Sequence, residues 1–397
     1  MRIGMILDNE FTGDLRVENE VNSLQNAGHQ VFVLCLNYGN KKNYEEFNGA
    51  KIVRFNLSKS IKNKLRFLNN TIFDIYSLLW SYKIISFAKA SAIEVLHVHD
   101  LYMAKSAITA NKKLKLTSVL DLHENYPATL ESYSWTKTFL GKLLVNPNMW
   151  LKNEEFYFQK FSKIIVLSKQ FQNVLSKRYP KIKKKLNVYP NYPNVKQLLD
   201  FPVDYKIIDK KSDFIIFYFG GIAERRGIFT LLDALKILVK KSDEFKVLLI
   251  GPVDTADSEK LDSYLSDNKI KNNIIYYKWK DIKHLPSYIE VSDICVSPLV
   301  KNDQHESGIA NKVFQYMLFE KPLIVSNCLP QQKVVEEENC GLVFESENVH
   351  DLAEKINTIR EDRDLGAMMG KNGKEAVLEK YNLDISKQNL IELYKTI

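Results

Sequence analysis

Short apolar runs alternate with amphipathic segments along this chain, and that alternation restricts the fold more than any other feature. Residues 3–7 and 31–36 form two such runs, and between them the apolar side chains of Val17, Val21 and Leu24 recur at helical spacing. A short apolar run fits a strand that is buried on both faces. The order of strand, helix and strand therefore predicts a right-handed βαβ crossover, the repeating unit of a parallel sheet.

The alternation continues through both halves of the chain. The further runs that fit buried strands are residues 95–98, 118–122 and 164–167 in the first half, and 214–219, 247–250, 274–277, 294–297, 323–326 and 341–344 in the second. Between the halves, residues 189–194 hold two prolines, which break a helix and disfavour a central strand. We therefore expect an α/β protein of two Rossmann-like, doubly wound domains facing a cleft. The expected domains are residues 1–198 and 199–380; helical patterns close the chain from residue 350, and a last helix, residues 381–397, can cross back to the first domain.

The chain carries a formal charge of +8, and lysines gather over residues 59–66 and 177–185. Such runs are solvated surface in most proteins, but they also favour an anionic membrane surface or an acidic substrate. No nucleic-acid module accompanies them, and the nearby aromatic residues do not form stacking platforms. An anionic membrane surface is thus an expected partner, and nucleic acid is not.

The four cysteines, Cys35, Cys295, Cys328 and Cys340, are scattered without the spacing of a metal site or a disulfide framework. The apolar run at residues 3–7 is far shorter than the core of a signal peptide. No apolar stretch reaches the roughly 18 residues of a membrane span. We therefore expect a cytoplasmic protein, at most peripheral to the inner face of the membrane.

The loop of residues 8–13 ends with Gly13 just before a predicted helix. Glycine lets the backbone approach a ligand closely, and the free N–H groups of a helix start can receive a phosphate. A lone loop glycine also fits an ordinary turn, so this signal is weak.

The loop after the strand at residues 214–219 carries Gly220 and Gly221, and then Arg225 and Arg226 at the start of the next helix. A guanidinium binds phosphate oxygens bidentately, so this combination favours a diphosphate. The alternative is a tight turn with two surface arginines.

A third loop precedes the helix that holds Asn311 and Gln315. Gly308 is expected to introduce this helix, whose first turn can bind an anion through its backbone. Glu306 can accept hydrogen bonds from sugar hydroxyls, and Gln315, on the same helix face as Asn311, can reach a ribose. The alternative is that both side chains are ordinary solvated surface.

Two predicted strands end in clusters of histidine and acid. One cluster contains His99 and Asp100, and the other contains His123, Glu124 and Asn125. A histidine beside an acid can be a general base, a metal ligand or a hydrogen-bonded structural group. The spacings match no common ligand motif, so no metal is expected.

At these loops the chain resembles glycosyltransferase family 4, retaining enzymes of the GT-B fold, and the likeness covers nearly the whole chain. The segments that carry it are Gly28-His29-Gln30-Val31, Asp121-Leu122-His123-Glu124, Val188-Tyr189-Pro190-Asn191 and residues 218–227, 292–298 and 306–322. Residues 218–227 are similar to the family's glycine loop, in which a basic side chain contacts the donor phosphate; Arg226 has that place here. Residues 306–322 resemble the family's signature of two glutamates.

Two positions depart from the family pattern. Gln315 stands where the family has its second glutamate, and Glu306 lies nine rather than eight residues before it. Glutamine can still bond to ribose hydroxyls, but less strongly than a carboxylate. The family's frequent arginine after the glycine-loop strand is replaced by glycine, and Arg225 or Lys312 is expected to supply the missing charge.

The resemblance implies a retaining transfer, without metal or other cofactor, of a hexose-type sugar from a nucleoside-diphosphate sugar to a glycan or lipid-linked acceptor, in cell-envelope polysaccharide assembly. The implied catalytic residues are His123, Arg226 and Glu306. The expected donor-binding residues are Gly13, Gly220, Gly221, Arg225, Gly308, Ile309, Ala310, Asn311, Lys312 and Gln315. The expected acceptor-side residues are His99, Asp100, Glu124 and Asn125.

Three other interpretations stay open. A GT-B epimerase or phosphorylase would share the fold, although the acidic segment at Glu306 favours a transferase. A noncatalytic partner that only binds the sugar nucleotide is compatible with Gln315. A nicotinamide dehydrogenase needs a GxGxxG turn after its first strand, whereas Gly13 stands alone.

Overall fold

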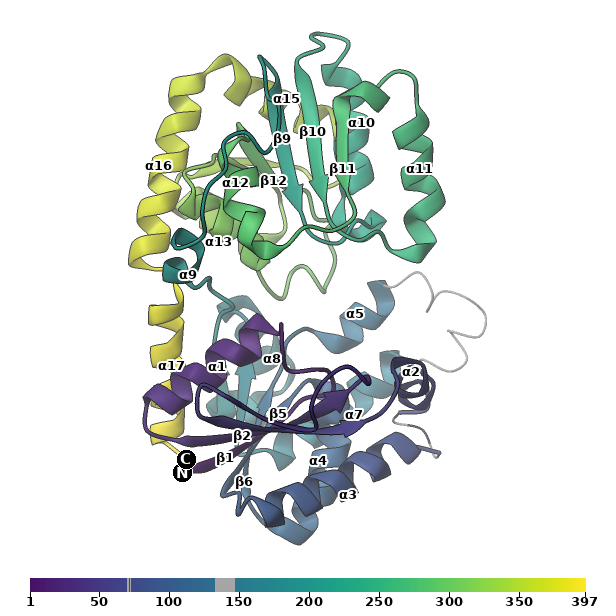
Figure 1. Ribbon diagram of the computed structural model, residues 1–397, viewed down its shortest axis with the longest axis vertical. Helices are drawn as coiled ribbons and strands as arrows, with labels where there is room; N and C mark the ends of the chain where they lie inside the picture. The colour runs from purple at the N-terminus through teal and green to yellow at the C-terminus, as the bar shows by residue number, and fades with distance from the viewer. Residues whose placement is uncertain (70, 72, 133–146) are drawn as a thin grey trace. The chain divides into compact units, whose positions relative to one another are not determined.

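The computed structural model describes residues 1–69, 71, 73–132 and 147–397. It divides into two compact units, Met1–Pro190 with Ser386–Ile397, and Asn191–Ile385; each is a parallel sheet between layers of helices (Figure 1). The sequence places the boundaries after residues 198 and 380 instead. The segment after Pro190 joins the second unit because the Asn311 side chain donates to the Asn191 carbonyl (2.8 Å) and Tyr192 packs against Phe314 (5.0 Å between ring centroids).

In the described residues, the sheet of the first unit has the strand order β3-β4-β2-β1-β5-β6-β7-β8. Its strands are β1 (Arg2–Ile6), β2 (Gln30–Asn37), β3 (Tyr44–Phe47), β4 (Ala50–Asn56), β5 (Val95–His99), β6 (Thr117–Asp121), β7 (Lys163–Val166) and β8 (Leu186–Val188). Neighbouring strands are parallel, apart from the antiparallel pair of β3 and β4. The strand order reverses between β1 and β5, and in such sheets ligands bind at the carboxyl ends beside this switch point.

Side chains alternate across these strands and build one apolar core on each face. Leu96 and Val98 of β5 belong to the core beneath α3 (Ile75–Ala90), α4 (Ala104–Leu114), α7 (Pro147–Lys160) and α8 (Lys169–Arg178). Ile3 and Met5 of β1 belong to the opposite core, beneath α1 (Leu15–Asn26) and α17 (Leu383–Lys395). The other helical segments are α2 (Lys59–Phe67), η1 (Leu101–Met103), α5 (Tyr126–Ser132) and η3 (Pro180–Lys185).

The hairpin of β3 and β4 was not predicted from the sequence. Asn48 and Gly49 join its strands with positive φ angles of 47° and 87°, as a two-residue hairpin turn requires. The Asn-Gly pair is therefore a signal for this turn. Because β3 lies at the sheet edge and alternates exposed with half-buried residues, it has no apolar run. β8 was missed as well, since only its first residue is fully buried.

In the described residues, the second unit has a six-stranded parallel sheet in the order β11-β10-β9-β12-β13-β14. Its strands are β9 (Phe214–Phe219), β10 (Phe245–Ile250), β11 (Ile274–Tyr277), β12 (Ile294–Ser297), β13 (Leu323–Ser326) and β14 (Gly341–Phe344). This is the strand order of a dinucleotide-binding doubly wound sheet, with its switch point between β9 and β12.

Helices cover both faces of this second sheet. One core lies beneath α10 (Ile228–Leu238), α11 (Ser258–Ser266) and α15 (Val349–Glu361). The other lies beneath α12 (Leu285–Glu290), α13 (Asn311–Leu318) and α14 (Leu329–Glu337), and α16 (Arg363–Glu379) contributes to both. The shorter segments are α9 (Val195–Leu199), η4 (Glu224–Arg226), η5 (Thr255–Asp257), η6 (Lys271–Asn273) and η7 (Ile282–His284).

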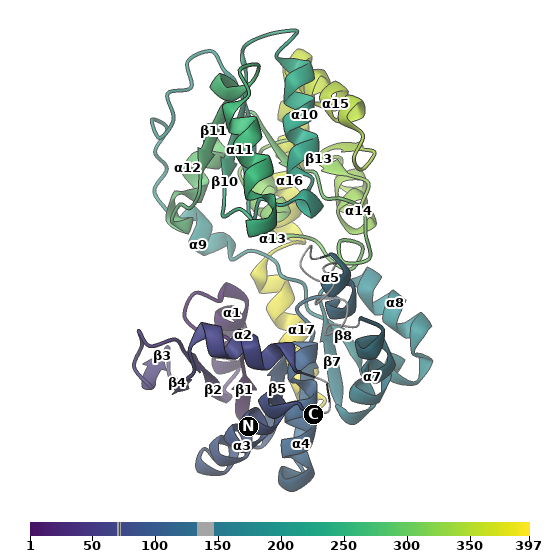
Figure 2. The ribbon, with the colours of Figure 1, turned by 90° about the vertical axis from the view of Figure 1, so that its right-hand side faces the viewer.

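The predicted fold class is confirmed within each unit: both are doubly wound α/β domains (Figures 1 and 2). Every predicted apolar run overlaps a strand, and three helices close the chain after residue 348. The four cysteines are buried free thiols. Among the described helices, none is long and apolar enough to cross a membrane.

Candidate functional site

The glycine loop of the second unit follows β9 at the switch point of the sheet. Gly220 and Gly227 have positive φ angles of 137° and 72°, a conformation that residues other than glycine rarely adopt. A Cβ at position 227 would lie 1.6 Å from the carbonyl oxygen of Pro298, so the loop meets the segment after β12 at a point where only glycine fits. The Tyr218 hydroxyl donates to the Gly221 carbonyl (2.8 Å) and holds the middle of the loop.

The two arginines of this loop differ in their partners. Arg225 forms an ion pair with Asp254, and its carbonyl accepts from the Val300 N–H (3.1 Å), so it ties η4 to the neighbouring loops. Arg226 is half-buried and has no acidic partner within the described part of the chain. Its charge lowers the pKa of Lys312. Arg226, rather than Arg225, is therefore the arginine whose charge is available to a ligand.

Lys312 lies in the first turn of α13 and is buried, with 8% of its surface exposed. Its Nζ lies 3.6 Å from the centroid of the Tyr218 ring. Burial, together with the nearby Arg226, lowers the pKa of Lys312 well below its ordinary value. Within the described residues neither cation has a carboxylate partner. Two adjacent cations without an acid form an electrostatic site for an anion.

Helix α13 begins at Asn311, so the prediction that Gly308 introduces it is wrong. The preceding residues form a separate turn, in which the Glu306 N–H donates to the Asn302 carbonyl (2.9 Å). Gly308 and Ile309 follow that turn outside any helix, and Ala310 is the N-cap of α13. Because alanine has no side-chain acceptor, no side chain caps α13. The Val313 N–H donates to the Ala310 carbonyl (3.0 Å), which leaves the N–H groups of Asn311 and Lys312 for an anion.

The remaining predicted donor residues of this unit have different surroundings. The Glu306 carboxylate accepts from the Leu329 N–H (2.9 Å) at the start of α14. Asn311 donates to the Asn191 carbonyl. Gln315 is buried (8% exposed), and its amide has no hydrogen bond to another described residue. Gln315 therefore keeps its hydrogen-bonding capacity, whereas Glu306 and Asn311 already use part of theirs.

Open space adjoins the glycine loop beside Lys312. A Cβ added at Gly221 would have no heavy atom within 4 Å, and one added at Gly220 would lie 3.8 Å from the Lys312 Nζ. The two glycines, Arg226 and Lys312 are thus brought together at the carboxyl end of β9.

The sequence did not mark His305 as a site residue, but it lies near these cations. Its Nδ1 donates to the Val300 carbonyl (2.7 Å), and its buried Nε2 has no hydrogen-bond partner within the described chain. Burial, with a contribution from Arg226, lowers the pKa of His305 to about 4. A neutral imidazole therefore presents a hydrogen-bond acceptor beside two positive charges.

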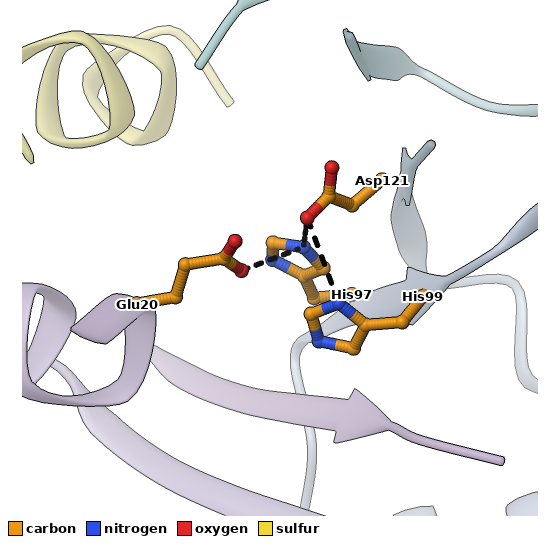
Figure 3. A group of neighbouring side chains, drawn as sticks. All are labelled: Glu20, His97, His99 and Asp121. Carbon is orange, nitrogen blue, oxygen red and sulfur yellow. Dashed lines mark ion pairs between the residues drawn. The ribbon is translucent and has the colours of Figure 1, made fainter. Parts of the chain in front are cut away.

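The first unit holds a buried polar cluster along β5 and β6 (Figure 3). Glu20 comes from α1, His97 and His99 come from β5, and Asp121 ends β6; all four are fully buried. The two imidazole rings stack with centroids 4.6 Å apart, and Figure 3 shows Glu20 and Asp121 approaching His97 from two sides. The His97 Nδ1 also lies 2.8 Å from the hydroxyl of Tyr394 in α17.

Arg16 of α1 links the two carboxylates of this cluster. Its guanidinium donates to both Asp121 oxygens (2.9 and 3.1 Å) and lies 3.1 Å from the Glu20 carboxylate. Burial opposes the ionisation of Asp121, but Arg16 and His123 outweigh it and hold the pKa of Asp121 well below its usual value. Burial and the charge of Asp121 raise the pKa of Glu20 well above its usual value. Asp121 therefore holds its negative charge more strongly than Glu20 does.

His123 lies where this cluster reaches the surface. Its Nε2 is 3.0 Å from the His99 Nδ1 and 3.2 Å from an Asp121 oxygen, and 19% of its side chain is exposed. Burial opposes protonation of His123, but Asp100 and Asp121 outweigh it and raise its pKa to about 9. Burial lowers the pKa of His99 to about 3. His123 is thus the charged imidazole of the pair, and it is the one that a ligand can reach.

By distance, the four buried side chains of Figure 3 could hold a metal ion, because one ligand atom from each lies within 4.8 Å of the others. Their charges argue against it. Arg16 and protonated His123 already lie against the Asp121 carboxylate, so a divalent cation would meet two competing positive charges in a buried site. The absence of a metal stays a prediction.

Three more predicted acceptor-side residues surround His123. Asp100, which has a positive φ of 71°, accepts from the Tyr102 hydroxyl (2.6 Å). Glu124 accepts from the Thr129 hydroxyl (3.0 Å), and burial together with Asp100 raises its pKa to about 7. Asn125 is buried, and its carbonyl accepts a backbone hydrogen bond at the start of α5. The structure therefore gathers the predicted acceptor-side residues at one place.

Gly13 is not among these residues. It lies in the loop before α1 with a φ of 97°, and its N–H donates to the Glu18 carboxylate (2.7 Å). That amide is used within the loop, as in an ordinary turn.

Arg16 and Glu20 were not predicted as site residues. A signal for them exists, since Glu20 falls on the helical face of Val17, Val21 and Leu24. A charged side chain within an apolar stripe indicates a buried polar partner.

Two family models match the chain. Residues 15–195 match the one described as Glycosyltransferase Family 4, and residues 204–376 match Glycosyl transferases group 1. The chain belongs to the family 4 glycosyltransferases. The first match contains the His123 cluster, and the second contains the glycine loop and α13.

The chain is also similar to individual proteins. The capsular polysaccharide biosynthesis glycosyltransferase CapM of Staphylococcus aureus is 27% identical over 209 residues, which is 50% of this chain and 52% of that protein. The matches span about half the length of these curated relatives. Sucrose-phosphate synthase from Thermosynechococcus elongatus (TM-score 0.81, 17% identity, 100% of this chain and 98% of that chain) shares the fold. So does Anabaena Alr3699/HepE in complex with UDP-glucose (TM-score 0.73, 14% identity, 100% of both chains).

Proposed function

We propose that this protein transfers a hexose-type sugar from a nucleoside-diphosphate sugar to a glycan or lipid-linked acceptor in cell-envelope polysaccharide assembly. The observation that carries the proposal is the pair of cations, Arg226 and Lys312, beside an open glycine loop with no acidic partner in the described residues. Family membership supports the reaction class. The capsular role in the name of CapM and the UDP-glucose bound to HepE support the pathway and the donor.

In this proposal the anomeric carbon separates from the diphosphate oxygen, and the acceptor hydroxyl oxygen takes its place on the same face of the sugar. The hydroxyl proton passes to the departing phosphate oxygen. Arg226, Lys312 and the first N–H groups of α13 stabilise the charge that develops on the diphosphate, as a metal does in other transferases. No metal is required, and the configuration at the anomeric carbon is retained.

The other residues orient the two substrates. The free amide of Gln315 binds ribose hydroxyls, and Glu306 accepts from sugar hydroxyls with the oxygen that α14 does not use. Protonated His123 donates to the donor sugar or to the acceptor.

Replacing Arg226 by alanine tests the proposal. Loss of a charge contact that strengthens in the transition state costs about 3 kcal/mol, or roughly a hundredfold in kcat. Arg225→Ala is the matched control, because its charge is paired with Asp254, and it should affect stability more than rate. The rate is measured as acceptor-dependent release of UDP from UDP-glucose. An Arg226→Ala enzyme with unchanged kcat contradicts the proposal, and UDP-sugar binding without turnover of any acceptor indicates a noncatalytic partner.

A further inference from the structure

Three helices of the first unit carry many positive charges and no negative ones. In α2, α3 and α4, all within the described residues, nine side chains are basic and none is Asp or Glu. The basic residues are Lys59, Lys62, Lys64, Arg66, Lys83, Lys89, Lys105, Lys112 and Lys113. The whole chain has 56 basic and 48 acidic residues, so this segregation is strong.

Some of these cations are used inside the unit. Lys62 donates to the Asp8 carbonyl (2.6 Å), and Arg66 stacks on the Tyr102 ring (3.6 Å) near the Asp8 carboxylate. Lys105 pairs with Asp74 (2.8 Å). The sequence suggested one basic surface over residues 59–66, but Lys62 and Arg66 are used inside the unit, so these residues do not form a single basic surface. The basic residues that remain exposed are Lys59, Lys64, Lys89, Lys112 and Lys113.

The outer face of α3 is apolar. Ile75, Leu78 and Tyr82 are 56%, 63% and 68% exposed, and their spacing of three and four places them on one side of the helix. Lys89 lies seven residues, about two turns, after Tyr82 and therefore on the same side of the helix. The opposite side of α3 is buried in the core through Trp80. The side of a helix that faces water is normally polar, so this exposed apolar side indicates an additional partner.

α3 and α4 lie side by side over the same core (Figures 1 and 2). Lys112 and Lys113 are exposed in the last turn of α4, the helix next to the one that carries the apolar stripe and Lys89. We call Ile75, Leu78, Tyr82 and these three lysines the basic-apolar face.

We propose that the basic-apolar face binds an anionic membrane surface. The lysines would contact lipid phosphates, while Ile75 and Leu78 enter the acyl boundary and Tyr82 lies at headgroup level. A nucleic acid or an acidic polymer would also attract the lysines, but it would leave the aliphatic side chains in water. The inference rests on the proposed function only in that the membrane would present a lipid-linked acceptor.

Cosedimentation with lipid vesicles, without donor or acceptor, tests this face. The protein is expected to bind vesicles of equal parts phosphatidylglycerol and phosphatidylcholine, and to bind pure phosphatidylcholine far more weakly. Leu78→Ser with Tyr82→Ser should lower the partition coefficient at least tenfold, because two buried apolar side chains are lost. Lys112→Gln with Lys113→Gln should lower it about fivefold per lysine at low salt.

Matched controls lie on the second unit. Trp279→Ser removes a 71% exposed aromatic side chain, and Lys371→Gln removes a cation whose side chain is 74% exposed; both should bind vesicles normally. The shift in melting temperature caused by UDP shows that each variant is folded, and it tests donor binding separately from membrane binding. Wild-type affinity in the Leu78/Tyr82 variant overturns the proposal. So does a homodimer that this variant dissociates, or binding of RNA in place of vesicles.

Discussion

Replacing Lys312 by methionine should make the empty protein more stable and its donor complex weaker. Methionine keeps most of the apolar contact with the Tyr218 ring but removes a buried amine that no carboxylate balances within the described residues. The folded protein binds fewer protons at this position than the unfolded chain, because burial and Arg226 lower the pKa of Lys312. The free energy of unfolding therefore rises with pH between that lowered pKa and the ordinary value, and the penalty is largest below this window. Removing it should add about 2 kcal/mol at neutral pH, or about 5 °C in Tm.

The same substitution should weaken donor binding. A charged hydrogen bond to phosphate contributes about 1.5–3 kcal/mol, so the Kd for UDP should rise about 10- to 150-fold. Binding of a diphosphate raises the pKa of Lys312, so the native protein should take up protons at a pH between the pKa values of the free and bound forms. Its Kd for UDP should then rise about tenfold per pH unit between the pKa values of the free and bound forms. Titration calorimetry in two buffers of different ionisation enthalpy measures this proton uptake, which Lys312→Met should abolish.

A second substitution returns the charge from a different position. A side chain at position 221 would begin in open space, so Gly221→Arg can place a guanidinium beside the same phosphates. The double variant Gly221→Arg/Lys312→Met should recover affinity without proton uptake, since arginine does not titrate in this range. Lys321→Met is the control: Lys321 donates to the Glu290 carbonyl (2.9 Å), so its loss should lower Tm and leave the Kd unchanged. Native-like UDP affinity in Lys312→Met, or a lower Tm, would refute the reasoning.

Four further outcomes are expected. His123 has a pKa of about 9 in the folded protein and an ordinary value of 6.5, so it stabilises the fold fully below pH 6.5 and loses this effect as the pH rises through about 9. Asp121→Asn should therefore move the alkaline fall of kcat to lower pH, and an unmoved pH profile would exclude a role for their contact. Arg16→Met removes the guanidinium that pairs with the buried Asp121 carboxylate and should cost about 3–5 kcal/mol in chemical denaturation. Gly227→Ala should reduce both Tm and UDP binding because its Cβ meets the Pro298 carbonyl. Activity should survive EDTA, and a loss that zinc or manganese restores would show a metal requirement.

Much of the fold follows from local pattern. Residues 214–219 are apolar throughout because both faces of β9 are covered, and such runs can be recognised without knowledge of the rest of the chain. β3 has one face toward solvent and lies at an edge, so its residues alternate and give a weaker signal. The hairpin could be predicted from the sequence only by looking for turn residues such as Asn48-Gly49.

The site is less predictable because its chemistry depends on partners far apart in the sequence. The sequence of residues 220–227 predicts a phosphate-binding loop, but it does not distinguish Arg225 from Arg226. The difference between them comes from Asp254, which pairs with Arg225. The sequence could not show that Lys312 folds over Tyr218, since that contact joins β9 to α13.

The charge balance of the two units supports the proposed division of the substrates between them. In the second unit, Arg226 and Lys312 lie together without an acid in the described residues, so a diphosphate gains attraction there from both. In the first unit, Arg16 and protonated His123 are balanced by Asp121 and Asp100, so an anion gains little. A neutral sugar, whose hydroxyls both donate and accept, fits such a balanced set of groups better than a phosphate does. The charges therefore favour the proposed arrangement, in which the donor diphosphate binds the second unit and the acceptor hydroxyl binds the first. UDP binding should therefore be lost with Arg226 and Lys312, and should survive replacement of Asp121 or His123.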